Sequence, residues 1–217
     1  MEITAGERNN LTNNWIKTGI YTGLISVLLY LSLLAPYPEG LKRIAFFAYG
    51  VLLIPAVIGL YYFFKARAGK TVKGQLAMVF GIIAGVMVNL MAVVQNSIRI
   101  YMRGYIENAE TPELQEQLRW IWRGLESVQL GMDVSWDIFI LSSLALFSLL
   151  VYMQKEFGKI FGATGLLLAL STLSLNLYTF PVPPGAVYGQ IWDFGPLCGL
   201  WFLAVLVRVA WLHFRKL

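Results

Sequence analysis

Residues 76–100 read LAMVFGIIAGVMVNLMAVVQNSIRI, and residues 128–153 read VQLGMDVSWDIFILSSLALFSLLVYM. Each run is long and apolar enough to cross a bilayer as a helix, which takes about 20 residues. The first run ends in amides and an arginine, and the second opens with two aspartates. We therefore expect a hairpin in which polar side chains leave one span at the level where carboxylates enter the next.

The composition places the whole chain in the same class as these two segments. Hydrophobic residues make up 58% of the 217 residues and charged residues only 13%, whereas a soluble domain has about 25% charged residues. The mean hydropathy is +0.64. Because the polar residues lie between long apolar runs, the sequence predicts an all-α integral membrane protein with a single domain over residues 1–217.

Six apolar runs are expected to span the membrane as helices, separated by prolines, glycines or clusters of charge. An amphipathic segment at about 112–126 follows the helix cap Thr111 and carries its apolar residues on one face. It predicts one interfacial helix between spans 3 and 4. The expected spans are residues 15–34, 44–64, 76–100, 128–153, 160–180 and 191–212.

The positions of lysine and arginine predict the orientation of the chain in the membrane. Six spans place both termini on one side. The loops expected on that side hold the basic run from Lys65 to Lys73, then Lys155 and Lys159, and a basic C-terminal tail. The positive-inside rule therefore predicts an inner (plasma) membrane protein with both termini in the cytoplasm. We attribute the net charge of +5 to this topology and not to nucleic-acid binding.

One cysteine, Cys198, and one histidine, His213, restrict the chemistry that the chain can perform. They exclude an intrachain disulfide, a cysteine metal cluster, haem ligation by two histidines and a histidine-based triad within the membrane. The sequence also has no phosphate-binding glycine loop and no HExxH motif. We therefore expect no cofactor, no metal site and no catalytic residue, which favours a function other than catalysis.

Polar residues of four expected spans fall at one depth, near the side opposite to the termini, if each residue advances the helix by about 1.5 Å. Asp133 and Asp137 are four residues apart and share a helix face. A charge near the bilayer centre costs at least about 2.5 kcal/mol, so we expect Asp137 to be paired, with Arg99 as its partner. The candidate ligand-binding residues are Asp137, Arg99, Asn96, Gln95, Asp133, Asn176, Tyr178, Trp136, Trp192, Asp193 and Asn89.

Two interpretations of this cluster are open at the level of sequence. In the first, the residues surround a water-accessible cavity that opens to the outer side, with residues 112–126 as its lid and Trp136, Trp192 and Tyr178 as its aromatic wall. In the second, the ionic pair joins two helices, and the shallower charges lie at the headgroups. Asn89 fits either the floor of a pocket or a bond between two helices.

The function expected from the first interpretation is a carrier or receptor that binds a small charged or amphipathic ligand. The alternative is an accessory or scaffold subunit, which would bind another membrane protein or a second copy through the face of Gly81 and Gly85, since small residues allow close helix contact. A third alternative is a lipid-modifying membrane enzyme, for which the sequence offers no nucleophile–base pair. Membrane lipids are expected partners in every case, and nucleic acid in none.

Overall fold

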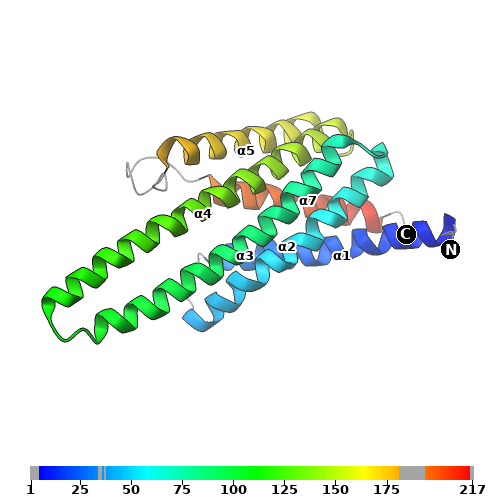
Figure 1. The fold of residues 1–217 in the computed structure, drawn as a ribbon. Coiled ribbons are helices and arrows are strands. Elements are labelled where there is room, and N and C mark those ends of the chain that lie inside the picture. The colour runs from blue at the N-terminus through cyan, green and yellow to red at the C-terminus, as the bar shows by residue number, and fades with distance from the viewer. Residues whose placement is uncertain (1–4, 34–35, 37, 181–193, 216–217) are drawn as a thin grey trace.

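The computed structural model describes residues 5–33, 36, 38–180 and 194–215, and within these residues all regular structure is helical (Figure 1). All six helices of the described residues are long and apolar enough to cross a membrane. The prediction of an all-helical chain with six helices able to span a membrane is therefore confirmed for the described residues. The helices are α1 (Ala5–Ser32), α2 (Glu39–Ala68), α3 (Val72–Glu107), α4 (Pro112–Met153), α5 (Lys159–Thr179) and α7 (Gly195–Phe214).

Helix length divides the molecule into two parts. Helices α5 and α7 have 21 and 20 residues, which at about 1.5 Å per residue matches the ~30 Å hydrocarbon core of a bilayer. Helices α3 and α4 have 36 and 42 residues and are far longer than a span needs. Figure 1 shows their hairpin projecting beyond the other helices. We call its outer part, residues 99–127, the distal arm.

The expectation of a separate interfacial helix over residues 112–126 is wrong, because these residues are the first third of α4. The predicted start is present: Thr111 caps the helix, and its hydroxyl accepts a hydrogen bond from the Leu114 N–H at 3.2 Å. After Pro112 in the first turn, no proline occurs before Met153, and single glycines such as Gly124 cost a helix only about 1 kcal/mol. The helix therefore continues without a break into the apolar run.

The distal arm is held together by its own contacts. The side-chain amide of Gln115 donates to the Ile106 carbonyl at 3.3 Å, which joins the two helices near the tip. Most of its other side chains are exposed, including Trp120 and Ile121. The arm therefore stands apart from the bundle that the remaining segments form.

Consecutive helices pack on each other, and α7 closes the bundle mainly by packing against α1. The start of α1 and the end of α7 lie at the same end (Figure 1). We call this the terminal end, and the end that carries the distal arm the distal end. In the terminal half the core is aromatic: Phe63, Phe64 and Phe147 are almost fully buried. The ring centroids of Phe64 and Phe147 are 6.1 Å apart.

Small residues bring the helix backbones close together along α2. A Cβ atom on Gly59 would lie 2.5 Å from the Cα of Gly19 in α1, so the two helices touch backbone to backbone. Gly81 and Gly85 of α3 face Val57 and Ile54 of the same α2 and are buried. The small-residue pair that we expected to serve a partner therefore contacts a helix of the same chain, and partner binding stays a prediction.

Candidate functional site

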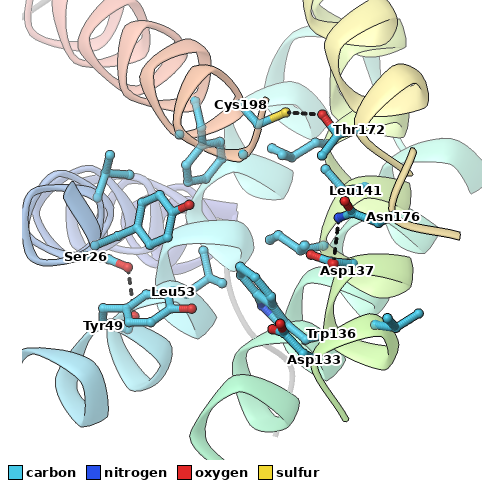
Figure 2. Close-up of a pocket in the computed structure, with 18 of the residues that line it drawn as sticks. Ser26, Tyr49, Leu53, Asp133, Trp136, Asp137, Leu141, Thr172, Asn176 and Cys198 are labelled. Carbon is cyan, nitrogen blue, oxygen red and sulfur yellow. Dashed lines mark hydrogen bonds between the residues drawn. The ribbon is translucent and has the colours of Figure 1, made fainter. Parts of the chain in front are cut away.

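A cavity of about 190 Å³ lies in the distal half of the bundle and is lined by side chains from five helices (Figure 2). Helices α1, α2, α4, α5 and α7 all contribute to its wall. From Leu130 to Leu144 it follows α4 over about 21 Å at the helical rise. The residues used below are Ser26, Val27, Tyr30, Tyr49, Leu53, Asp133, Trp136, Asp137, Leu141, Leu144, Thr172, Asn176, Cys198 and Phe202.

Helix α4 supplies the acidic side of the wall. Asp133, Asp137 and Leu141 recur every four residues, so they lie along one stripe of the helix. Trp136 lies beside this stripe and also lines the cavity. Both aspartates are partly buried, and Figure 2 shows them on the inner face of α4, across the cavity from Tyr49.

Helix α5 fixes the deeper of the two carboxylates. The side-chain amide of Asn176 donates a hydrogen bond of 2.7 Å to Oδ2 of Asp137. A neutral amide orients a carboxylate without adding a compensating positive charge. One helical turn away, Thr172 donates to the Leu168 carbonyl at 2.7 Å, and its oxygen lies 3.4 Å from the sulfur of Cys198 in α7. Polar contacts in the cavity wall therefore link α5 to both α4 and α7.

The opposite wall is formed by α1 and α2 and is aromatic toward the distal end. Ser26 donates a hydrogen bond of 2.8 Å to the backbone carbonyl of Tyr49, which holds the two helices in register. The rings of Tyr30 and Tyr49 lie 5.6 Å apart between centroids in a tilted arrangement. This places two phenol side chains across the cavity from the acidic stripe.

The polarity of the wall changes along the cavity. Toward the distal end lie Asp133, Asp137 and Asn176, together with the aromatic rings. Deeper in the bundle the wall is mainly apolar, with Leu141, Leu144 and Phe202. Among the lining residues that the structure describes, no lysine, arginine or histidine occurs. The cavity is therefore amphipathic, with an acidic distal part and an apolar deep part.

One polar atom of the wall makes no hydrogen bond to the residues that the structure describes. The indole Nε1 of Trp136 is buried and has no partner among the described residues. Buried donors in proteins are almost always satisfied by protein, water or ligand. This N–H can therefore donate to a water molecule or another acceptor in the cavity.

The structure brings four of the expected site residues together around the cavity: Asp133, Trp136, Asp137 and Asn176. The four expected residues of α3 lie elsewhere. With its amide oriented to satisfy both ends, Asn89 donates to the Phe47 carbonyl at 2.9 Å and accepts from the Val51 N–H at 3.2 Å, so it binds α2. Asn96 donates to the Ala92 carbonyl of its own helix at 2.8 Å. Gln95 and Arg99 are likewise not among the lining residues described.

The expected ion pair between Arg99 and Asp137 does not form. Arg99 is exposed on α3, and the ion pairs among the described residues are Arg67–Glu156, Arg103–Glu107 and Glu116–Arg119. The physical reason is that α3 packs against the far side of α2 and α4, so its polar stripe faces away from the cavity. An arginine at a helix position near headgroup level has access to water and needs no buried partner.

The remaining expectations concern the rim of the site. Tyr178 is 76% exposed and is not among the lining residues. Trp192 and Asp193 lie outside the described residues. The expected lid over residues 112–126 is the start of α4 in the distal arm, so it does not exist as a separate cover. Nor does any group of three or more potential metal-binding side chains occur in the described part of the chain.

Sequence reasoning missed the walls contributed by α1, α2 and α7. Ser26 and Tyr30 are four residues apart, as are Tyr49 and Leu53, so each pair occupies one helix face. A tyrosine one turn from a small or apolar residue is common in membrane helices and marks no site alone. The available signal was that these pairs lie at the same depth in the bundle as Asp133 and Asp137. This signal identifies a site only when the packing order of the helices is known.

Comparisons with protein-family models, with curated proteins and with solved structures found no match. The function is therefore argued from the geometry of the cavity.

Proposed function

We propose that the distal cavity binds a small amphipathic ligand and that the protein acts as a carrier or receptor for it. The observation that supports this proposal is the wall itself: five helices place carboxylates, an amide, phenols and apolar side chains around one space. Ligand sites are typically concave and mostly apolar, with a few placed polar groups. An amphipathic wall of this kind suits a molecule with one polar end and one apolar end.

Energetic cost argues against a purely structural role for the acidic stripe. A partly buried carboxylate inside a membrane protein is expensive, and such residues generally face water or a transported or bound molecule. A packed core would bring the opposing helices together and remove the space, as it does in the terminal half of this bundle. Here Asp137 is oriented by Asn176 and still lines a cavity. The unsatisfied N–H of Trp136 supports an occupant in the same place.

The size of the cavity limits the ligand. Its volume of about 190 Å³ is below the range of drug-sized sites, about 300–1,000 Å³. It slightly exceeds the ~150 Å³ apolar cavity that accommodates benzene in another protein. The ligand that we propose therefore has a ring or a short alkyl chain and one polar group.

We also propose an inner-membrane location with both termini in the cytoplasm. The terminal end carries Lys65, Arg67, Lys70 and Lys73 in and after α2 without an intervening acid. The distal arm balances its arginines with glutamates, as in the pairs Arg103–Glu107 and Arg119–Glu116. This asymmetry supports a cytoplasmic terminal end and a cavity on the extracytoplasmic side.

Filling the cavity tests the binding proposal directly. Val27 lines the cavity, so in Val27→Phe a larger side chain occupies the ligand space. Val207 is 53% exposed on the surface of α7, and Val207→Phe makes the same chemical change outside the cavity. The probes are 2-phenylethylamine, 2-phenylethanol and 3-phenylpropionate, with binding to purified protein in lipid nanodiscs followed by tryptophan fluorescence and thermal stability.

We expect at least one probe to bind the unmodified protein and Val207→Phe but not Val27→Phe. Binding that persists in a folded Val27→Phe protein would contradict the proposal. So would the absence of binding by all three probes to the unmodified protein. Because Val27→Phe fills empty space, its melting temperature also reports whether the variant is folded.

The second candidate function is self-association through the distal arm. It is favoured by the exposed apolar side chains Tyr101, Trp120 and Ile121, which project with the arm beyond the bundle. Native mass spectrometry of the full chain would show a dimer that Ile121→Gln weakens. A monomer at every concentration measured would contradict this candidate. The two functions are compatible, because the arm and the cavity involve different residues.

A further inference from the structure

We infer that the cavity selects a cation, and that its ligand is a small organic ammonium compound with an apolar ring or chain. This inference rests on the binding proposal above and adds the sign of the charge. Sequence reasoning left the sign open, because it expected Arg99 at the site. With Arg99 exposed on α3 and outside the cavity, the charges that the described wall contributes are those of two aspartates.

The first support is the electrostatic balance of the wall. Asp133 and Asp137 line the cavity, and no basic residue is among the described lining residues. The segment 181–193, which precedes α7, also contains no lysine, arginine or histidine in its sequence. A cleft with one sign of charge and low-dielectric walls concentrates ions of the opposite sign. The balance therefore favours cations over anions.

The second support is the aromatic wall opposite the acids. Tyr30 and Tyr49 lie on the α1–α2 side, and Trp136 lies next to the acidic stripe. The faces of aromatic rings attract ammonium groups, by about 0.5–2 kcal/mol depending on desolvation. Carboxylates and aromatic rings thus act on the same end of the ligand.

The third support is the apolar deep part, which sets the orientation of the ligand. An ammonium group near Asp133 and Asp137 leaves the rest of the molecule to extend along α4 toward Leu141, Leu144 and Phe202. The reverse orientation would desolvate the charge among apolar side chains and leave the carboxylates beside a hydrocarbon group. The wall therefore specifies both the charge and the direction of binding.

The single cysteine provides a test that works without an identified ligand. Cys198 is the only cysteine in the chain, and it lines the cavity beyond Asn176. Three thiol reagents of similar size differ in charge: cationic 2-aminoethyl, anionic 2-sulfonatoethyl and neutral methyl methanethiosulfonate. In each reaction the Cys198 thiolate attacks the reagent's sulfenyl sulfur, forming a mixed disulfide and releasing methanesulfinate. The rates are measured by intact-protein mass spectrometry on the full chain in lipid nanodiscs.

We expect the cationic reagent to modify Cys198 at least about tenfold faster than the anionic one, the lower range for electrostatic concentration of ions in a charged cleft. In the double variant Asp133→Asn with Asp137→Asn the ratio should approach one. The neutral reagent corrects for access, and a rate equal to that of the SDS-denatured chain would identify an unfolded variant. Glu126→Gln, which neutralises an exposed acid of the distal arm, is the matched control and should leave the ratio unchanged.

The outcomes separate the two proposals. If the neutral reagent reaches Cys198 but the cationic reagent is no faster than the anionic one, the charge inference is wrong and ligand binding stands. If the denatured chain reacts but no reagent reaches Cys198 in the folded protein, the cavity is closed to small molecules and both proposals are wrong. A ratio above ten that survives in the folded double variant would also overturn the charge inference, because the selectivity would then arise elsewhere.

Discussion

The terminal and distal halves of this bundle use the same helices in different ways. In the terminal half, glycines let backbones touch, as at Gly19 and Gly59, and aromatic rings such as Phe64 and Phe147 fill the remaining space. In the distal half, the same α1, α2 and α4 carry tyrosines and aspartates toward each other and leave a cavity. The difference teaches that single helices can pack closely at one end and line a cavity at the other.

Polar bonds follow the same division. At the terminal end, Arg208 donates two hydrogen bonds, of 2.7 and 3.1 Å, to the Glu156 carbonyl, and Arg67 pairs with the Glu156 carboxylate at 3.1 Å. These bonds tie α2 and α7 to the turn between α4 and α5. At the distal end, Asn176 orients Asp137 toward a space. Cations thus serve packing at one end, while carboxylates face a cavity at the other.

The largest effect is expected from removing a ring of the terminal core. Phe147 is fully buried, and Phe147→Ala should lower the free energy of unfolding by about 3–5 kcal/mol, since it leaves a cavity that the helices fill only in part. Phe180, which is 52% exposed, is the control, and Phe180→Ala should change stability by less than about 0.5 kcal/mol. Thermal and denaturant unfolding in one detergent would measure both. Equal losses would contradict the division between a packed core and an exposed surface.

A smaller loss is expected where two backbones touch. In Gly59→Ala the new Cβ would lie 2.5 Å from the Cα of Gly19 and 2.6 Å from the Trp15 carbonyl oxygen, so α1 must move away. Overpacking of this kind costs about 1–3 kcal/mol. Gly124→Ala in the distal arm meets nothing within 4 Å, and should instead stabilise the protein by about 0.5–1 kcal/mol through helix propensity. If Gly59→Ala melted as late as Gly124→Ala, the close contact would be wrong.

Substitutions at the cavity in the distal half should change ligand binding more than they change stability. Asp137→Asn keeps the shape of the side chain and removes its charge. We expect it to weaken 2-phenylethylamine binding about tenfold, which corresponds to ~1.4 kcal/mol, because the ammonium group loses an ionic partner. Binding of neutral 2-phenylethanol should change less than twofold, and isothermal titration in nanodiscs would measure both ligands. An equal loss for amine and alcohol would indicate that Asp137 maintains the shape of the cavity.

Sequence reasoning correctly predicted the part of the fold that hydropathy determines, which is the set of six long apolar helices. Long apolar runs specify membrane-spanning helices because backbone groups in lipid must bond within the segment. It missed the continuity of α4, since an amphipathic pattern looks the same in a separate interfacial helix and in the exposed start of a longer one. Thr111 marked the start of α4 correctly, but no residue near 127 marks an end.

The candidate residues of α4 and Asn176 of α5 line the cavity, whereas Tyr178 of α5 and the four candidates of α3 do not. That the lining residues bind a ligand stays a prediction. Asp133, Asp137 and Asn176 could be placed by depth alone, because helical rise converts residue number into height. Depth does not give rotation about the helix axis or the order in which helices pack. Asn89 and Arg99 lie on the expected span, but Asn89 faces the α2 backbone and Arg99 is exposed. The walls from α1 and α2 were missed for the same reason.

The smallest effect is expected at Arg99, where the ion pair predicted from sequence and the observed structure lead to different expected results. If Arg99 were the partner of Asp137, Arg99→Gln would leave a buried carboxylate without its cation, which would cost about 3–5 kcal/mol. Because Arg99 is exposed on α3 and lies outside the cavity wall, we expect Arg99→Gln to change unfolding by less than about 0.5 kcal/mol and 2-phenylethylamine binding less than twofold. The same titration and melting experiments as for Asp137→Asn provide the comparison. A tenfold change in amine affinity would place Arg99 in contact with the ligand, and it would remove the basis for an acidic cavity.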